Sequence, residues 1–179
     1  MFTHEISEKI KNGGVGVIPT DTLYGIVCSA MSAESVERIY SLKNRNPEKP
    51  LIVLIGQLSD LNKFGISSDE QMALSLKKYW PGPNSIILPV SGSNFNYLTR
   101  GSGGIAFRFP ADEELAKFLR ESGSIVAPSA NLEGEIPAST IESAELYFPE
   151  LDFYVNGGEK SGEPSKLLKF ADGKFEQLR

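Results

Sequence analysis

The stretch Val15-Gly-Val-Ile-Pro-Thr-Asp-Thr-Leu-Tyr-Gly25 places a short apolar segment directly before a run of polar side chains. Its apolar start predicts a buried strand, which Pro19 ends because proline has no N–H to donate to a neighbouring strand. Thr20, Asp21 and Thr22 then supply three side chains that can hydrogen-bond. Polar groups just past a buried strand lie where open α/β sheets bind ligands. The alternative is a loop that caps the next element, since Thr and Asp are good helix N-caps.

The bulk composition indicates a globular chain. Its 179 residues suit one domain spanning residues 1–179, and 40% of them are hydrophobic, which is enough for a core. No apolar run approaches the ~20 residues that a membrane helix needs. The N-terminus lacks the basic and apolar regions of a signal peptide. We therefore expect a soluble cytoplasmic protein with no membrane segment.

The reactive residue types are scarce, with one cysteine, Cys28, and one histidine, His4. A single cysteine excludes an internal disulfide and a cysteine-rich zinc site. Cys28 follows two apolar residues, which favours a packed core thiol, and His4 lies far from every polar motif, so we discount Ser-His-Asp and Cys-His mechanisms. The net charge of −5 argues against a general nucleic-acid binder, whose affinity depends on many phosphate contacts.

Helical and strand-like patterns alternate along the chain, which predicts an α/β fold. Ser68–Gln71 and Ser139–Glu142 have the form of capping boxes, and Ser32 is a third N-cap candidate. Residues 91–104 and 157–165 are predicted loops, and the pattern around Gly173 predicts a hairpin, so the sheet should be partly antiparallel. We expect helices over 2–11, 33–43, 68–79, 111–120 and 139–148, and strands over 15–18, 51–55, 85–90, 105–109, 124–127, 151–155, 167–170 and 174–178.

Lys43, Arg45 and Lys49 lie within seven residues and could point to one place. Apart from Glu48 no acid accompanies them, so they would repel one another unless an anion lies there. A polyphosphate is the obvious candidate, because Arg offers a planar fork and Lys a point charge. A solvated helix end is the alternative, since cations favour that end of the helix dipole. We expect Lys43 and Arg45 to be exposed, so that removing either leaves the melting temperature nearly unchanged.

Arg108 interrupts an apolar strand between Phe107 and Phe109. Strand alternation places it on the face opposite both aromatic rings, where a buried charge needs an anionic partner. A ligand carboxylate would serve, and the alternative is a salt bridge to an acid such as Glu113 or Glu114. No Walker A or Gly-x-Gly-x-x-Gly sequence is present, so any nucleotide is bound in another way.

Ser129 and Asn131 offer a hydroxyl and an amide just after a predicted strand. Such groups suit a nucleotide base, ribose or phosphate. They suit equally a loop that is held together by its own side chains.

Taken in order, five motifs resemble the YrdC-like threonylcarbamoyl-AMP synthase family, over nearly the whole chain. They are Pro19–Gly25, Lys43-Asn44-Arg45 followed by Pro50-Leu51, Trp80–Pro83, Phe107–Pro110 and Ser129–Asn131. The resemblance implies a single-domain, twisted mixed α/β sheet around a large open cavity. Because the chain stops at Arg179, it resembles the short form, without the extra C-terminal domain of longer members.

The resemblance implies a nucleotidyltransferase with three substrates. L-threonine, bicarbonate and ATP would give L-threonylcarbamoyladenylate and pyrophosphate. The product would serve a downstream tRNA threonylcarbamoyl-transfer complex that makes N6-threonylcarbamoyladenosine at tRNA position 37. No protein nucleophile is required, which suits a chain without a usable histidine or cysteine, and catalysis would rest on positioning and electrostatic stabilisation.

The same resemblance assigns residues to ligands. Lys43 and Arg45 would hold the triphosphate and act in catalysis. The remaining assignments are Ser85, Ser129 and Asn131 to ATP, Thr22, Lys49 and Arg108 to threonine with Arg108 on its carboxylate, and Thr20, Asp21, Tyr24 and Ser165 to the site without a settled role. Mg2+ would bridge the phosphates, because the sequence has no dedicated acidic cage for a metal.

Two positions depart from the family pattern and leave alternatives open. Glu133 stands where the family often has a second serine after Ser-Ala-Asn, and Lys166 follows Ser165 where threonine is common. One alternative is an RNA-binding protein of the same fold that binds tRNA or double-stranded RNA without this chemistry. The other is a related branch that uses another carboxylate or carbamoyl donor.

Overall fold

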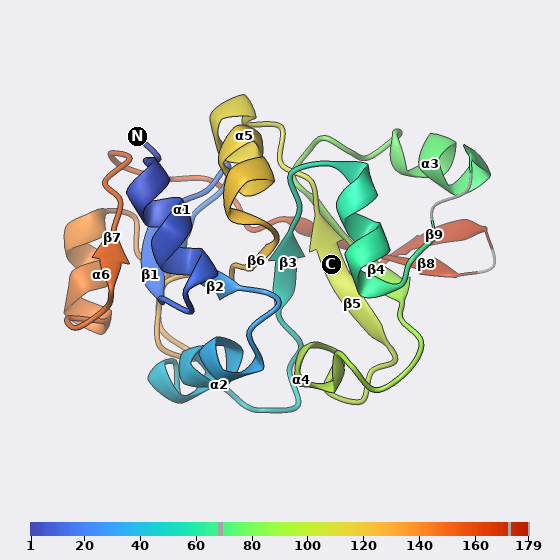
Figure 1. The fold of residues 1–179 in the computed structure, drawn as a ribbon. Helices are drawn as coiled ribbons and strands as arrows, with labels where there is room; N and C mark the ends of the chain where they lie inside the picture. The colour runs from blue at the N-terminus through green and yellow to red at the C-terminus, as the bar shows by residue number, and fades with distance from the viewer. Residues whose placement is uncertain (68–69, 172, 179) are drawn as a thin grey trace.

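The chain folds around a mixed β-sheet with helices on both faces (Figure 1). The computed structural model describes residues 1–67, 70–171 and 173–178. Within these ranges nine strands form one sheet in the order β7-β1-β2-β6-β3-β5-β4-β8-β9. Their bounds are β1 Gly16–Pro19, β2 Tyr24–Ser29, β3 Ile52–Leu54, β4 Asn84–Pro89, β5 Gly104–Arg108, β6 Ile125–Val126, β7 Phe153–Tyr154, β8 Lys166–Ala171 and β9 Lys174–Gln177. The predicted α/β class is confirmed.

Parallel and antiparallel pairs are mixed, as predicted. The pairs β1/β7, β3/β5 and β4/β8 are parallel, and the other neighbours are antiparallel. The helices are α1 His4–Lys11, α2 Ala33–Leu42, α3 Glu70–Leu76, α4 Asn96–Thr99, α5 Glu113–Ser122 and α6 Ile141–Tyr147, with a 3-10 helix η1 over Leu58–Phe64. The short α4 lies inside a segment predicted to be loop.

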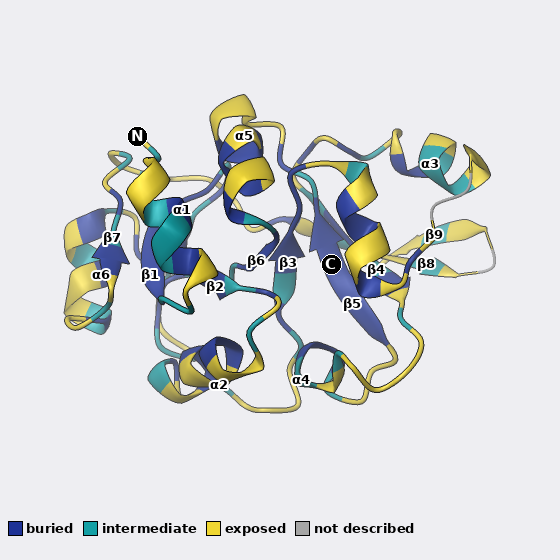
Figure 2. Cartoon of the chain, viewed as in Figure 1, coloured by how far each residue is buried: buried dark blue, intermediate teal, exposed yellow. Residues whose placement is uncertain are grey.

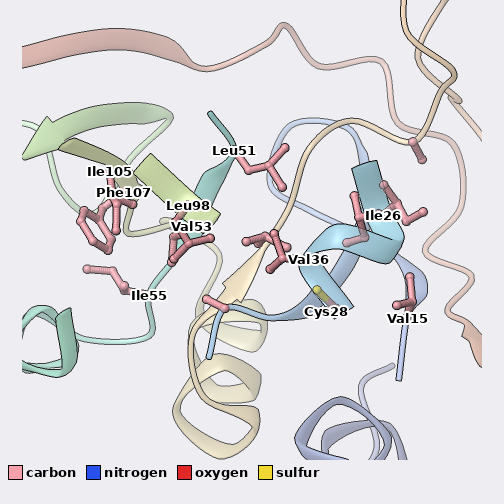
Figure 3. Packing of buried hydrophobic residues seen from close by; sticks show 14 of the residues in the cluster. Val15, Ile26, Cys28, Val36, Leu51, Val53, Ile55, Leu98, Ile105 and Phe107 are labelled. Carbon is pink, nitrogen blue, oxygen red and sulfur yellow. The ribbon is translucent and has the colours of Figure 1, made fainter. Parts of the chain in front are cut away.

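Side chains alternate along the strands between two apolar clusters, one on each face of the sheet. On β5, Ile105 and Phe107 belong to the larger cluster, shown in Figure 3 with Cys28. On β6, Ile125 packs in the smaller cluster beneath α1 and α5, whereas Val126 belongs to the larger one. Figure 2 shows the strands mostly buried and the outer faces of the helices exposed.

The helix caps follow their sequence signals with one shift. Ser32 accepts from the backbone N–H of Ser35 and starts α2, as predicted. The capping box of α6 is Thr140 with Ser143, one residue later than predicted; Thr140 has the extended backbone of an N-cap and its side chain accepts from the Ser143 backbone N–H. The predicted capping box at Ser68 lies partly outside the described residues.

Strand β2 was not predicted, and its presence changes the structural role of the polar residues Thr20, Asp21 and Thr22. β2 pairs antiparallel with β1, with Pro19 opposite Tyr24, so residues 20–23 form the loop of a hairpin. The alternative that Thr20 or Asp21 caps a following helix is therefore wrong. Pro19 is the last residue of β1, so the strand ends one residue later than predicted.

The single cysteine and histidine behave as predicted. Cys28 is fully buried among apolar side chains, and burial raises the pKa of its thiol well above the ordinary value. His4 lies on the surface, where its ring contacts the Glu121 carboxylate at 2.6 Å. Among the described residues, none of the helices has the length and apolar character to cross a membrane.

Candidate ligand-binding cavity

A cavity of about 650 Å³ lies on the sheet face that carries the smaller apolar cluster. Helices α1 and α5 cover that face over β1, β2 and β6, and farther along the sheet the same face is lined by alternate strand residues. On β5, Ala106 and Arg108 line the cavity while Phe107, between them, packs in the core on the other side. The predicted orientation of Arg108, opposite its aromatic neighbour, is confirmed. The floor also includes Ile52 of β3, Ile87 of β4, and Leu167 and Lys169 of β8.

The hairpin loop after β1 forms one wall, and the Thr20 hydroxyl holds the loop together. This hydroxyl donates to the Leu23 carbonyl at 2.7 Å and accepts from the backbone N–H groups of Thr22 and Leu23 at 3.2 and 3.3 Å. The Thr20 backbone N–H also donates to the Leu23 carbonyl at 3.0 Å. The loop is therefore fixed locally, and both threonine side chains line the cavity.

Arg108 reaches across the cavity floor to this loop. Its Nη1 donates to Thr22 Oγ1 at 3.2 Å and its Nη2 to Thr20 Oγ1 at 3.4 Å. Its Nη2 also lies 3.0 Å from Asp21 Oδ1 in an ion pair, although the geometry does not align a hydrogen bond with that oxygen. The alternative of a salt bridge within the protein is therefore confirmed, but the acid is Asp21 and neither Glu113 nor Glu114. Helix α5 carries Glu113 to Arg120 on the surface instead.

Burial sets the electrostatics of the Asp21–Arg108 pair. The side chains are 9% and 5% exposed. Burial raises the pKa of the Asp21 carboxyl, and the Arg108 charge opposes that rise. Burial lowers the pKa of the Arg108 guanidinium, which Asp21 in turn opposes. The buried Nε–H of Arg108 has no hydrogen-bond partner. Because neither side chain is in water, the Arg108 charge favours the ionised form of the Asp21 carboxyl, and Asp21 balances the charge of a guanidinium that stays protonated.

The segment after β7 passes over the hairpin loop and completes the wall. The Tyr24 hydroxyl donates to the Gly158 carbonyl at 2.8 Å and accepts from the Gly157 N–H at 2.9 Å. Gly162 packs so closely that a Cβ there would lie 2.3 Å from the Thr22 carbonyl oxygen. Only glycine allows this approach of two backbones. Ser165, at the end of the segment, lines the cavity.

Lys43 is not exposed as predicted, since it is only 1% accessible. Helix α2 ends at Leu42, and Lys43 is its C-cap residue. Asn44 follows with a φ of 48°, the left-handed conformation typical of the residue after a helix. The Lys43 Nζ donates to the Ser129 carbonyl at 2.6 Å and also to the Asn131 carbonyl. Burial, helped by repulsion from Arg45, lowers the pKa of Lys43 from 10.5 to about 8. The idea of a solvated helix end is therefore wrong for Lys43.

Arg45 and Lys49 do line the cavity. Arg45 is anchored by its own loop, donating to the carbonyls of Lys49 and Pro50 at 3.3 and 3.0 Å. The Lys49 ammonium pairs with the carboxylate of Glu133, whose other oxygen accepts from the Asn46 backbone N–H at 2.6 Å. The protein thus supplies an anion of its own to the cation cluster. Charge repulsion among the cations alone is consequently no argument for a bound polyphosphate.

Ser129 and Asn131 are joined to each other and to Lys43. Ser129 Oγ donates to Asn131 Oδ1 at 2.6 Å, and the Asn131 amide donates to the Leu132 and Glu135 carbonyls, both at 2.8 Å. The Asn131 side chain therefore holds its own loop, which was one of the two predicted possibilities. Ser129 lines the cavity, whereas Asn131 does not.

The cavity therefore collects most of the residues that the sequence singled out. Those lining it are Thr20, Thr22, Tyr24, Arg45, Lys49, Arg108, Ser129 and Ser165. Those behind its walls are Asp21, Lys43, Ser85 and Asn131, each in contact with a lining residue or its backbone. Ser85, for example, is buried and shares a 2.8 Å hydroxyl contact with Ser165.

Sequence reasoning missed Lys169 and Glu48, which also line the cavity. The signal for Lys169 was available, because it alternates with Leu168 and Phe170 along β8. Lys166, one of the two positions that differ from the family pattern, is exposed and does not line the cavity. In the described part of the chain, no three acidic, histidine or cysteine side chains gather as metal ligands.

A mixed α/β sheet with a concave site lined by apolar floor residues and convergent polar groups is typical of α/β proteins that bind small molecules. Its family follows from comparison with known proteins. The chain matches the family profile of Sua5, YciO and YrdC proteins, described as telomere recombination, over residues 8–179. It belongs to this family, and the resemblance seen in the sequence motifs is confirmed.

Curated relatives carry one name. The threonylcarbamoyl-AMP synthase of Idiomarina loihiensis is 33% identical over 173 residues, covering 93% of this chain and 92% of the relative. Those of Pyrococcus abyssi and Bacillus subtilis are 33% and 34% identical, over 84% and 91% of this chain. The chain spans only 45% and 48% of those two proteins.

Solved structures agree on the fold. Pyrococcus abyssi Sua5 in complex with L-threonine superposes with a TM-score of 0.88 at 28% identity, covering 98% of this chain and 53% of that one. Escherichia coli YciO gives a TM-score of 0.84 at 22% identity, which supports the fold alone. The predicted mixed sheet of the YrdC type is confirmed.

Proposed function

We propose that this protein is a threonylcarbamoyl-AMP synthase, a nucleotidyltransferase that uses L-threonine, bicarbonate and ATP. The observation that carries the proposal is Arg108, a buried guanidinium on the floor of the cavity. It donates to the side-chain hydroxyls of the protein's own Thr20 and Thr22. Its relatives bear that name, and one related structure contains L-threonine. The product would serve the tRNA threonylcarbamoyl-transfer complex in the cytoplasm.

The amino-acid site would lie at the Arg108 end of the cavity. The threonine carboxylate would bind Arg108, because a guanidinium matches the geometry of a carboxylate. Thr22 would accept or donate a hydrogen bond to the same substrate, and Lys49 would add positive charge. Asp21 would keep Arg108 in place before the substrate arrives, which is a positioning role.

The nucleotide site would lie toward Arg45 and Ser129. Arg45 would contact the triphosphate directly, since it lines the cavity and has N–H groups beyond those bonded to its own loop. Lys43 and Asn131 would act through the backbone and hydroxyl of Ser129, which they hold. Ser85 would act through Ser165 in the same way. Mg2+ would enter with the phosphates as part of the substrate, without a cage of protein carboxylates.

The chemistry requires placement more than protein nucleophiles. Bicarbonate takes up a proton and loses water to give carbon dioxide. The neutral amine of threonine then forms a bond to this carbon and releases a proton, which gives a carbamate. A carbamate oxygen then attacks the α-phosphorus of ATP, the bond to the β-phosphate oxygen breaks, and pyrophosphate leaves. Cationic side chains around the phosphates would stabilise the charge that develops on the leaving pyrophosphate.

The test is product analysis by mass spectrometry together with pyrophosphate release. We expect threonylcarbamoyladenylate, and pyrophosphate only when threonine and bicarbonate are both present. Turnover that proceeds equally well without threonine would exclude this function. Carbamoylation of another substrate would indicate a branch with another donor. Salt-sensitive RNA binding without ATP turnover would indicate the RNA-binding alternative.

A further inference from the structure

The anion in the cation cluster belongs to the protein itself. Glu133 lies 84 positions from Lys49 in sequence, yet its Oε1 contacts the Lys49 ammonium. Its Oε2 accepts from the Asn46 N–H at 2.6 Å, and its backbone N–H donates to the Lys43 carbonyl at 3.0 Å. The carboxylate is therefore held by side-chain and backbone contacts from the loop that carries the cations.

Glu133 interacts with all three cations of the cluster. The hydrogen bond from Lys49, the Asn46 N–H and the nearby charges of Lys49 and Arg45 lower the pKa of the Glu133 carboxyl, so it is ionised at neutral pH. Its negative charge in turn favours the protonated form of Lys43, against the effect of burial. Glu133 does not itself line the cavity, but Arg45 and Lys49 do, so its negative charge acts on an incoming polyanion from behind these two side chains.

We propose that Glu133 is a specificity-determining residue of the nucleotide site, which makes the site prefer triphosphate complexed with a divalent cation over the metal-free triphosphate. This inference rests on the proposed function. Metal-free ATP carries about four negative charges and its magnesium complex about two, so one fixed carboxylate repels the free form more strongly.

The Glu133→Gln variant isolates the charge. The amide oxygen of glutamine can still accept from the Asn46 N–H, so the loop keeps its backbone contact while the negative charge is lost. Glu133→Asp keeps the charge and tests whether its sign or the shape of the side chain matters. Glu135→Gln is a matched control, because it makes the same charge change two residues away at an exposed position.

The experiment is calorimetric titration of the full chain with ATP, once with excess MgCl2 and once with EDTA, at equal ionic strength. The measured quantity is the ratio of the two dissociation constants, a readout that does not depend on turnover. We expect Glu133→Gln to lower the dissociation constant of metal-free ATP about tenfold and that of the magnesium complex about threefold. The ratio of the two dissociation constants should therefore fall about threefold. Glu133→Asp and Glu135→Gln should keep the parent ratio.

The outcomes separate the inference from the proposed function. If the parent binds ATP but Glu133→Gln leaves the ratio unchanged, or weakens both forms equally, Glu133 is a structural residue of the loop and the inference is wrong. If Glu135→Gln narrows the ratio as much, the effect is one of net charge and the inference is also wrong. If the parent binds no ATP in either condition, the proposed function fails and the inference fails with it.

Discussion

Lys43 and Arg108 are both buried cations beside the cavity, but their surroundings differ. Lys43 donates to the neutral carbonyls of Ser129 and Asn131 and forms no ion pair within the described residues. Arg108 is paired with the Asp21 carboxylate and faces the cavity. The comparison teaches that burial without a carboxylate partner lowers the pKa of a lysine into the range where it loses its proton, whereas the guanidinium of Arg108 stays protonated and its charge is largely balanced by Asp21.

The largest expected effect comes from breaking the Asp21–Arg108 pair. Arg108→Ala should lower the free energy of unfolding by about 3–5 kcal/mol, because it leaves a buried carboxylate unpaired. Urea denaturation measures this loss. The double variant Asp21→Asn/Arg108→Met removes both charges and should lose less. If the double variant is as unstable as Arg108→Ala, the pair is not what stabilises this region.

The next effect is a pH dependence that belongs to Lys43 alone. Its pKa is about 8 in the folded protein and has an ordinary value of 10.5. The unfolded chain therefore binds more protons between these values, and the free energy of unfolding should rise with pH across this window. Relative to Lys43→Met, the parent should gain about 3 kcal/mol from below pH 8 to above pH 10.5.

Chemical denaturation of the parent and of Lys43→Met over that pH range makes the measurement. The difference between the two proteins removes the contributions of other lysines and tyrosines. A difference that stays flat would mean that Lys43 keeps its ordinary pKa in the folded protein. The contrast with Arg108 would then fail.

A third effect concerns ligand binding. Arg108→Ala should weaken threonine about ten- to a hundredfold, because a charge-assisted contact with a carboxylate contributes roughly 1.5–3 kcal/mol. ATP affinity should change far less. Calorimetric titrations with each ligand, on a variant shown to be folded, measure the two losses. Equal losses for threonine and ATP would show that Arg108 supports the structure without recognising the carboxylate.

The smallest effect is expected at Arg45. Arg45→Ala should change the free energy of unfolding by no more than about 0.5 kcal/mol, because the side chain is partly exposed and donates to backbone carbonyls of its own loop. ATP should nevertheless protect the variant from heat less than it protects the parent. Arg45→Lys should not restore full protection, since an ammonium cannot copy the guanidinium fork. Equal protection of parent and Arg45→Ala would place the phosphates elsewhere.

Much of the fold could be predicted because it depends on local patterns. The alternation around Arg108 correctly placed its side chain opposite Phe107, and the Ser32 cap correctly marked the start of α2. Strand β2 was not predicted because its continuous apolar run, Ile26–Cys28, is only three residues long between Gly25 and Ser29. Its absence from the prediction made the Thr20 loop look like the start of a helix.

The partners of the charged residues could not be predicted in the same way. The Lys49–Glu133 contact joins residues 84 positions apart, and the Asp21–Arg108 pair depends on the β1–β2 hairpin that was missed. Exposure was also misjudged at Lys43. A lysine that follows an amphipathic helix is usually solvated, and only the tertiary position of the Ser129 loop covers this one.

The alternation along β5 links the cavity to the accuracy of folding. Phe107 and Arg108 are consecutive, so a slip of β5 by one residue against β3 would turn the guanidinium into the apolar core and the aromatic ring into the cavity. Such a misaligned state would be strongly penalised on both faces at once. The Arg108 guanidinium, which we propose binds a carboxylate, thus also favours the correct register of β5 during folding, because a misaligned strand would bury this charge in the core.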